Sequence, residues 1–421
     1  MKLSLPIYTL LLGMWLSPAG AEERALGSDV AGLLAYAREH NPELAAVRHE
    51  ADAVRQRVQP AGALPDPVLR TELMDVTNQG TNKAASLLPS QVGSTRYLLM
   101  QEVPWFGKRS LQREVAEAQA AQADGQSAST WAELSGRIKA AYAMYYYLSG
   151  SEHLARQTLE LLDNLERVAQ TRYANGLGSQ QDVIRAQVEQ TTLRAELIEL
   201  ESERHHEQSR LNALLSRPAM AELAEPAQLP PLPTAAQLDY PALEQKLRAR
   251  NPQLQIAEAQ VQSAEKGRDL AYVNRYPGFT LGIAPNQSGN SVKSWDLMVE
   301  FNIPLQQESR RSQEREAEAQ LAASESRKHA LLDRMLAELS ENVYGLETAR
   351  RTESLAANRL LPQSELTYQS ALAGYETGRV EFAMLIEAQR QILKAKQQRL
   401  KAQLDAQLRL AEIERLLGEE S

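Results

Sequence analysis

Two halves of the sequence repeat each other, and this duplication limits the possible folds more than any other feature. The segment YANGLGSQQDVIRAQ, which starts at Tyr173, reappears 202 residues later as YETGRVEFAMLIEAQ, which starts at Tyr375. Asn41 and Asn251, each followed by proline, match at an offset of 210. Repetition in the same order indicates a duplicated unit. Further matched pairs are Pro67 and Pro277, Pro104 and Pro304, and Tyr142 and Tyr344.

Each half predicts the same order of elements: a helix, a pair of strands, a very long helix, the Tyr-x-x-Gly break and another helix. Only 5% of the residues are aromatic and 24% are charged, as in extended helices that bury narrow seams. Trp131, Leu134, Ile138, Ala141 and Tyr145 have the 3-4-3-4 spacing of a coiled-coil seam. We therefore expect a rod or bundle. The expected helices cover residues 27–62, 107–174, 179–215, 239–274, 306–374 and 380–417.

The duplication also predicts domain boundaries. We expect a first repeat over 22–215 with a β-hairpin at 67–104, and a second repeat over 239–421 with a β-hairpin at 278–304. The segment 216–238 between them is rich in proline, which forbids helix and favours an extended linker.

The first residues predict a cleaved signal peptide over 1–21. Lys2 precedes an apolar run that ends at Leu16, and the small residues Ala19 and Ala21 follow where a signal peptidase would cleave. The alternative is a membrane anchor, but the run is shorter than the ~20 apolar residues that span a bilayer. We therefore expect an exported protein.

The composition excludes several classes of site. The chain has no cysteine, which excludes disulfides, thiolate metal sites and a lipid anchor on an N-terminal cysteine. Its formal net charge is −8 and it has no basic cluster, which argues against nucleic acid as a partner. The six histidines show no zinc-binding spacing, and no nucleophile elbow, phosphate loop or dinucleotide fingerprint occurs. We expect no metal site, no cofactor and no enzyme activity.

Four segments alternate apolar and polar residues with period two. From Trp295 to Ile303 one side is wholly apolar and the other mostly polar, and similar alternation occurs in FTLGIAPN, VLRTELMDV and TRYLLMQEVPW. Strands of about ten residues with this pattern suit a membrane barrel, apolar outward and polar inward. The polar stretches at 77–94 and 284–291 are expected to be loops that face the outside medium. The residues predicted to form the aromatic belts are Tyr97, Trp105, Phe106, Phe279, Trp295 and Phe301.

A membrane sheet of this size cannot stand alone. Four strands are too few to close around a pore, and open sheet edges are forbidden in lipid. A membrane location therefore requires oligomerisation, and three copies would supply about twelve strands. The alternative is a soluble β-hairpin that caps a helical bundle.

With these features the chain resembles the TolC family of outer-membrane efflux ducts. The resemblance covers essentially the whole mature chain and rests on the duplication, the paired strands, the signal peptide and both Tyr-x-x-Gly breaks. PWFGKR, which starts at Pro104, looks closest to the CzcC- and CusC-like branch that serves heavy-metal resistance-nodulation-division pumps. The resemblance implies a mainly α fold with membrane β: a trimeric twelve-stranded outer-membrane barrel continued by a periplasmic α-helical tunnel. It also implies a homotrimer in outer-membrane lipid, a periplasmic adaptor and an inner-membrane pump as partners.

In such proteins the Tyr-x-x-Gly turns form the periplasmic tip, where the adaptor docks and the tunnel narrows. Asp182 matches the acid of the first-repeat motif, and Glu387 falls where the second repeat often has one. Met384 departs from the pattern, and Glu381 or Glu376 could compensate for it. The alternative for each acid is a solvated helix face. The expected adaptor-docking residues are Tyr173, Gly176, Gly178, Tyr375, Gly378 and Arg379.

The expected function is that of the exit duct of a tripartite efflux system for heavy-metal cations. Drug efflux and type I protein secretion are alternatives within the same class. A secreted coiled-coil scaffold without a pore is the alternative from another class.

Overall fold

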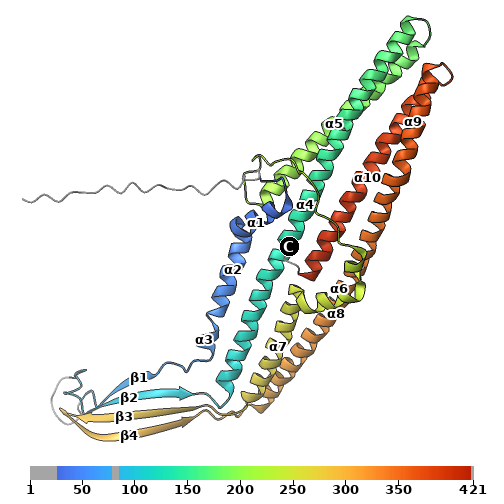
Figure 1. The fold of residues 1–421 in the computed structure, drawn as a ribbon. Coiled ribbons are helices and arrows are strands. Elements are labelled where there is room, and N and C mark those ends of the chain that lie inside the picture. Colours follow the sequence, from blue (N-terminus) through green and yellow to red (C-terminus); the bar gives the residue numbers. More distant parts are fainter. Residues whose placement is uncertain (1–25, 78–84, 419–421) are drawn as a thin grey trace, which may run out of the picture.

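The computed structural model describes residues 26–77 and 85–418, which form a long helical rod with a four-stranded sheet at one end (Figure 1). The predicted signal peptide, residues 22–25 at the start of the predicted first repeat, residues 78–84 of the predicted loop at 77–94 and residues 419–421 at the end of the predicted second repeat lie outside the described residues.

Both halves of the chain follow the predicted order of elements. The first half contains α1 (Val30–His40), α2 (Pro42–Arg55), α3 (Val58–Ala61), β1 (Val68–Met74), β2 (Ser94–Val103), α4 (Lys108–Ala174) and α5 (Gln180–Leu214). The linker predicted at 216–238 to be free of helix ends in the short 3-10 helix η1 (Ala235–Leu238), after its last proline. The second half contains α6 (Tyr240–Arg250), α7 (Pro252–Val273), β3 (Phe279–Ser288), β4 (Ser291–Phe301), α8 (Gln307–Leu355), the π-helical segment η2 (Ala356–Leu360), α9 (Leu361–Glu376) and α10 (Phe382–Leu417).

The first expected helix of each half is interrupted, which corrects the prediction. In place of one helix over 27–62 the structure has α1, α2 and α3, and in place of 239–274 it has α6 and α7. The break falls at Asn41 and Asn251, whose backbone is extended (ψ 119° and 121°) because each precedes a proline. The long helix expected over 306–374 also contains the π-helical segment η2.

The repeated asparagines join two helix ends. Asn41 caps α2 by accepting a hydrogen bond from Leu44 N, and its Nδ2 donates to the carbonyl of Leu214 at the end of α5 (2.9 Å). Asn251 caps α7 in the same way and donates to the carbonyl of Leu416 at the end of α10 (2.8 Å). Helices α5 and α2 therefore follow one another along α4, as α10 and α7 do along α8 (Figure 1).

The core is divided into small clusters along the rod. Leu134, Ile138, Ala141 and Tyr145 of the predicted seam are buried in one of them. Beside them the hydroxyl of Tyr142 donates to the carbonyls of Ser28 and Gln228, which lie outside its helix. Burial raises the pKa of Tyr142 to about 12. The seam thus holds the first helix and the linker against α4.

Candidate channel-forming elements

The four strands form one antiparallel sheet in the order β1-β2-β3-β4 (Figure 1). The register pairs Phe279 with Phe301, Leu281 with Val299 and Ile283 with Leu297, and Leu99 of β2 pairs with Ile283. Directly paired residues share a face of a sheet. One face is therefore apolar across the last three strands.

That apolar face lies open to the surroundings. Trp295, Leu297, Val299 and Phe301 of β4 are 67%, 79%, 49% and 61% exposed. An exposed apolar row of this length is unusual on a water-soluble protein and marks a contact surface. Among the described residues no helix is long and apolar enough to cross a bilayer.

The opposite face differs in part from the expected polar surface. Arg96 pairs there with Glu72 (3.8 Å) and Asp296 (3.6 Å), as a polar interior requires. Beside this ion-pair row, however, Leu98 and Ala284 are almost fully buried and pack with two methionines. The expectation of a mostly polar inner face is therefore wrong for the middle of the sheet, where Gly282 has no side chain and lets Leu98 and Met298 approach from the strands on either side. The buried cluster consists of Leu98, Met100 and Ala284, with Met298 packed against it.

The predicted aromatic residues separate into two groups along the strands. Trp105 and Phe106 follow β2, and Phe279 and Phe301 form a pair at the same end of the sheet. Trp105 stacks on Tyr276 at 5.0 Å, and Phe106 lies 6.4 Å from Phe279, which makes a continuous aromatic cluster where strands become helices.

The other two, Tyr97 and Trp295, lie nearer the connections between the strands. Trp295 is six residues from Phe301, which is about 20 Å at 3.3 Å per residue. That separation is close to the height of about 25 Å of the apolar band in a membrane barrel. Their role as membrane belts remains a prediction.

The predicted loop at 284–291 is mostly strand, which is a second correction. β3 extends to Ser288 and β4 starts at Ser291, so that only Gly289 and Asn290 form the turn, with Gly289 at a φ of +63°. The polar composition of this segment suggested a loop. Pro285 is accommodated in β3 because it lies where the β2–β3 ladder skips two pairs, so that no N–H donor is needed there.

The two Tyr-x-x-Gly turns have the same backbone geometry at the other end of the rod. Gly176 and Gly378 both have φ +72°. Leu177 N donates to the carbonyl of Arg172 and Arg379 N to that of Gly374, each at 2.8 Å, which closes the last helical turn. A left-handed residue of this kind favours glycine, which explains the repeated motif.

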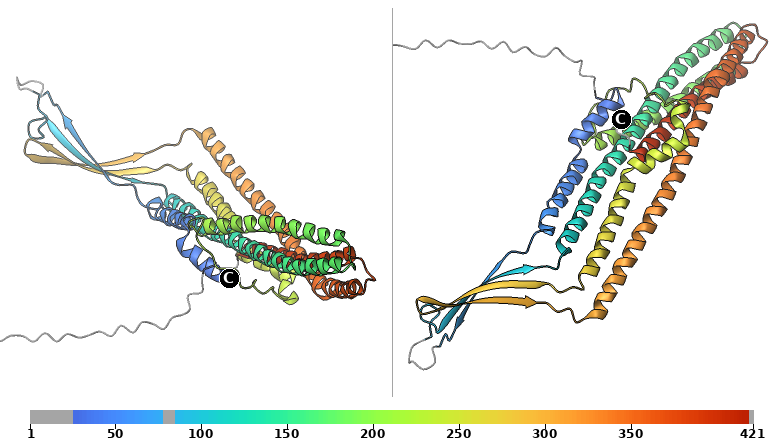
Figure 2. Two further views of the ribbon diagram at one scale, coloured as in Figure 1. Left: turned by 90° about the horizontal axis from the view of Figure 1, so that it is seen from above. Right: turned by 60° about the horizontal axis from the view of Figure 1, so that its bottom comes forward.

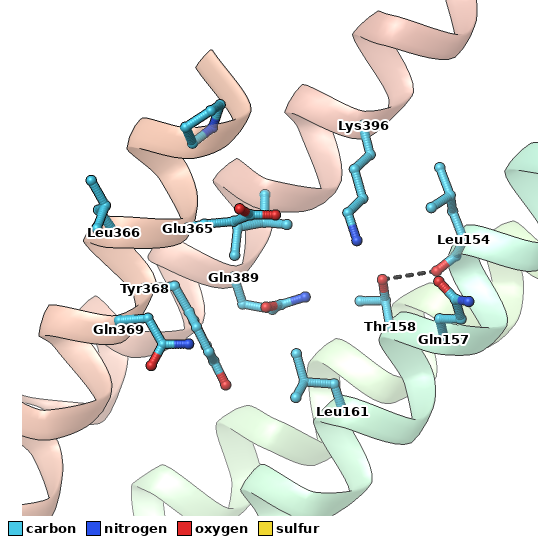
Figure 3. Close-up of a pocket in the computed structure, with 12 residues that line it drawn as sticks. Leu154, Gln157, Thr158, Leu161, Glu365, Leu366, Tyr368, Gln369, Gln389 and Lys396 are labelled. Carbon is cyan, nitrogen blue, oxygen red and sulfur yellow. Dashed lines mark hydrogen bonds between the residues drawn. The ribbon is translucent and has the colours of Figure 1, made fainter. Parts of the chain in front are cut away.

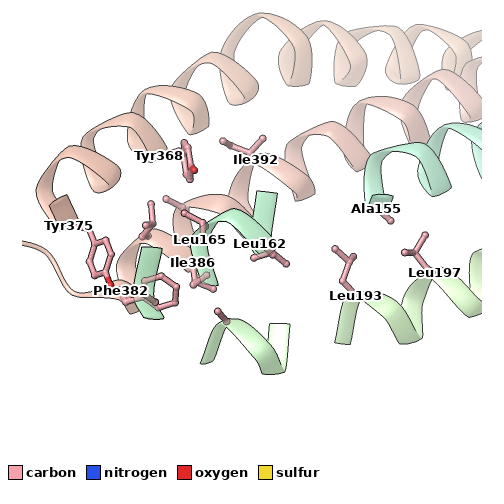
Figure 4. Packing of buried hydrophobic residues seen from close by; sticks show 14 residues of the cluster. Ala155, Leu162, Leu165, Leu193, Leu197, Tyr368, Tyr375, Phe382, Ile386 and Ile392 are labelled. Carbon is pink, nitrogen blue, oxygen red and sulfur yellow. The ribbon is translucent and has the colours of Figure 1, made fainter. Parts of the chain in front are cut away.

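Arg172 links the two turns, although the sequence analysis did not single it out. Its guanidinium donates to the carbonyls of Glu376 (2.9 Å) and Leu177 (3.2 Å) and lies 4.8 Å from the centre of the Tyr375 ring. Tyr375 is only 3% exposed and packs on Phe382 at 5.2 Å (Figure 4). A motif search could not find Arg172, because arginine is common on helix surfaces and two of its partners, Tyr375 and Glu376, come from the other half of the chain.

The four predicted acids do not meet in one chain. Asp182 lies in the first turn of α5, close enough to Tyr375 to raise the pKa of that tyrosine, although burial is the larger cause. Glu387 is half-exposed and lies 3.8 Å from Arg390, which also binds Glu189. Glu376 and Glu381 are exposed on either side of the second turn. Any ring of these acids would need further copies of the chain.

A groove lies beside the tip between α4, α9 and α10 and has a volume of about 640 Å³. Figure 3 shows Lys396, Gln389 and Thr158 directed toward the same space. The amide oxygen of Gln389 is buried and has no hydrogen-bond partner within the described part of the chain. The groove can therefore offer an occupant both a cation and an acceptor.

Within residues 26–77 and 85–418, no group of three histidine or acidic side chains could hold a metal ion. His153 contacts Gln157 (2.8 Å) and His40 stacks on Tyr36. These histidines therefore have ordinary helix-surface contacts.

The comparison with protein families identifies the class. The model of the family described as "Outer membrane efflux protein" matches residues 33–217 and 243–419, and the chain therefore belongs to this family. The predicted fold class and the prediction of a non-enzymatic protein are confirmed by this membership.

The similar proteins include a metal-resistance protein and two channel proteins. The cobalt-zinc-cadmium resistance protein CzcC of Cupriavidus metallidurans is 21% identical over 390 residues, 91% of this chain and 88% of the relative. The solved structure of CusC has a TM-score of 0.79 at 17% identity and covers 96% of both chains. The outer-membrane channel OprN has a TM-score of 0.79 at 19% identity over 92% of this chain and 89% of that one. The resemblance to the TolC family and its CzcC- and CusC-like branch is confirmed.

Proposed function

We propose that three copies of this chain form a passive conduit across the outer membrane, continued by a helical tunnel in the periplasm. The observation that carries the proposal is a sheet with an exposed apolar face and two edge strands, β1 and β4, each of which pairs on one side only within the described part of the chain. In lipid the apolar face is solvated, whereas the edges need hydrogen-bond partners. A neighbouring copy can supply them.

The strand directions support closure by identical copies. β1 and β4 run in opposite directions because the four strands alternate. The β4 edge of one copy can therefore pair antiparallel with the β1 edge of the next. Every strand in the ring is then antiparallel to both of its neighbours. Repetition around a three-fold axis leaves no edge exposed.

The proposed cargo is heavy-metal cations, delivered by a resistance-nodulation-division pump through a periplasmic adaptor. The support is the match to a cobalt-zinc-cadmium resistance protein and to CusC. The adaptor would dock on the two turns at the tip, where Tyr173 and Leu177 are 48% and 67% exposed and Gly378 and Arg379 are also exposed. Asp182, with Glu387, Glu381 or Glu376, would form acidic rings that attract cations once three copies assemble.

Assembly is tested by sedimentation of the detergent-solubilised protein and by carbonate washing of membranes. A trimer that resists carbonate is expected. A monomer, or a protein released by carbonate, would point to a secreted scaffold without a pore.

The cargo is tested by tolerance to cobalt, zinc and cadmium in a host that carries the cognate pump and adaptor but lacks this chain. Restoring the chain should restore tolerance to the metals. Restored tolerance to drugs alone, or restored secretion of a protein, would assign one of the other efflux roles.

A further inference from the structure

The face of the sheet opposite the apolar one carries sulfur atoms as well as ion pairs. Three of the nine methionines of the chain lie in the four strands, and all three, Met74, Met100 and Met298, lie on the face that holds Arg96. The strands extend beyond the ends of the helices, so that among the described elements no helix packs across this face (Figure 2). In the proposed conduit this inner face lines the lumen, where it would meet the cargo.

Two of these methionines flank one glycine. The register places Met100, Gly282 and Met298 in one row across β2, β3 and β4. Neighbouring strands lie about 4.8 Å apart, so that the Cα atoms of the two methionines are separated by roughly 10 Å. The methyl carbon of Met298 lies 3.3 Å from the position that a Cβ on Gly282 would take, and this side chain therefore already reaches over the glycine toward β2. Met100 belongs to the cluster against which Met298 packs.

The glycine leaves a place where the two sulfur atoms can meet. A side chain at position 282 would fill that space, since a Cβ there would also lie 3.0 Å from Cδ1 of Leu98. A methionine side chain has three rotatable bonds and adapts to its surroundings, so that two thioethers can turn toward one ion above Gly282. Thioether sulfur is a soft ligand that selects soft ions such as Cu(I), whereas hard ions such as Mg²⁺ prefer oxygen.

Two carboxylates lie one row closer to the helices on the same face. Glu102 and Glu300 pair with the same residue of β3 from its two sides, and both are exposed. Their negative charge raises the local concentration of cations of any kind. On the other side of the methionine row, Arg70 and Arg96 lie 3.9 Å and 3.8 Å from Glu72, which offsets part of their charge. The carboxylates can thus attract cations, and the thioethers can discriminate among them.

We propose that Met100 and Met298 bind soft monovalent metal ions, Cu(I) or Ag(I), as these ions pass through the lumen. Two neutral thioethers hold such an ion weakly, which suits a conduit, because a permeating ion must leave each site as well as enter it. The inference narrows the proposed heavy-metal cargo to its soft members. Its place in the lumen rests on the proposed function, whereas metal binding by the methionine pair can be measured on the purified protein in any oligomeric state.

The test follows isotope-labelled methionine methyl groups by nuclear magnetic resonance while Ag(I) is added to the detergent-solubilised full chain in a chloride-free buffer. The signals of Met100 and Met298, assigned with the single variants Met100→Leu and Met298→Leu, should shift with Ag(I) and stay in place with Mg²⁺. The double variant Met100→Leu/Met298→Leu conserves side-chain volume. In competition with a metal-binding dye it should bind Ag(I) at least about tenfold more weakly than the wild type. The matched control is Met220→Leu/Met384→Leu, which removes two methionines outside the sheet that are 87% and 61% exposed, and it should bind Ag(I) like the wild type.

The outcomes separate the methionine site from the conduit. Signals of Met100 and Met298 that do not shift with Ag(I), or equal affinity in the double variant and the control, would overturn the site even in a protein that sediments as a trimer. A monomer in which both signals shift would overturn the proposed function and support the site. The double variant should sediment like the wild type. If it does not fold, the wild-type spectra and the two single variants decide the question.

Discussion

The two turns at the end of the rod are copies in sequence and backbone, but they pack differently. Tyr173 in the first turn is 48% exposed, whereas its counterpart Tyr375 is 3% exposed and packs on Phe382. Gln180 stands at the position that corresponds to Phe382. Both copies thus keep the reversal of the chain. The second turn is fixed by the packing of Tyr375 on Phe382, and we call this pair the anchor, whereas the first turn is free to contact other molecules.

The largest expected effect is at the anchor. Phe382→Ala removes a fully buried aromatic side chain and should cost about 3–5 kcal/mol in the stability of the tip, whereas Gln180→Ala, at the matched exposed position, should cost within about 0.5 kcal/mol. Hydrogen exchange of the amides at the ends of α9 and α10 measures this difference. Equal protection in the two variants would show that the turns are equivalent after all.

Arg172→Ala should have the next largest effect, because it removes two hydrogen bonds to carbonyls and the contact with the Tyr375 ring. We expect a loss of about 2 kcal/mol in local stability, since hydrogen bonds from charged donors are each worth about 1.5–3 kcal/mol and this site is partly exposed. The exposed Arg379→Ala is the control. Faster proteolysis of the second turn in Arg172→Ala alone would support the link, and its absence would contradict it.

Asp182→Ala tests whether the freer turn carries the constriction. It should raise the ion conductance of the purified channel in planar bilayers, because the smaller side chain widens the constriction. It should also reduce the channel's preference for cations, because a ring of like charges attracts cations. Glu387→Ala, whose acid is held near Arg390, is the comparison and should change conductance less. Unchanged conductance and selectivity in Asp182→Ala would remove this residue from the gate.

The smallest expected effect concerns the hydroxyl of Tyr375, which is buried and has no hydrogen-bond partner among residues 26–77 and 85–418. Tyr375→Phe should be neutral or slightly stabilising at pH 7. Burial raises the pKa of Tyr375, so the folded tip binds this proton more tightly than the unfolded chain does. Stability is therefore retained below pH about 10 and falls as the pH rises above that value.

Hydrogen exchange at pH 9 and pH 11 compares this fall in the wild type and in Tyr375→Phe. The variant should lose less stability than the wild type, and Tyr173→Phe should behave like the wild type. An equal loss in all three proteins would mean that Tyr375 does not titrate in this range.

Sequence reasoning succeeded where a local pattern determines local structure. Period-two alternation in Trp295–Ile303 sets a strand with one apolar face, and Gly176 and Gly378 set chain reversals, since both depend on residues a few positions apart. It failed where distant contacts decide. Pro285 lies within a strand because the facing β2–β3 ladder skips two pairs there. The breaks at Asn41 and Asn251 had a local signal in the proline that follows each of them, but their hydrogen bonds to carbonyls at the ends of other helices could not be predicted from the sequence.

In the candidate site as well, local motifs predicted some residues and distant contacts determined the others. The turns and the aromatic residues could be located from motifs, whereas Arg172 acquires its importance from Tyr375 and Glu376, which lie more than 200 positions away. The buried cluster around Leu98 was also missed, because alternation indicates which face a residue occupies but not which side chains of neighbouring strands will contact each other there.

The asparagine junctions have a mechanical consequence. At each junction a side-chain amide bonds the start of one helix to a carbonyl at the end of another, α2 to α5 and α7 to α10. Each joined pair therefore acts as one continuous rigid element beside the long helix. A force applied at the turns is then carried along both joined pairs to the strands. The variant Asn251→Ala removes one of these hydrogen bonds. It should let the part of the rod nearer the strands move independently of the part nearer the turns.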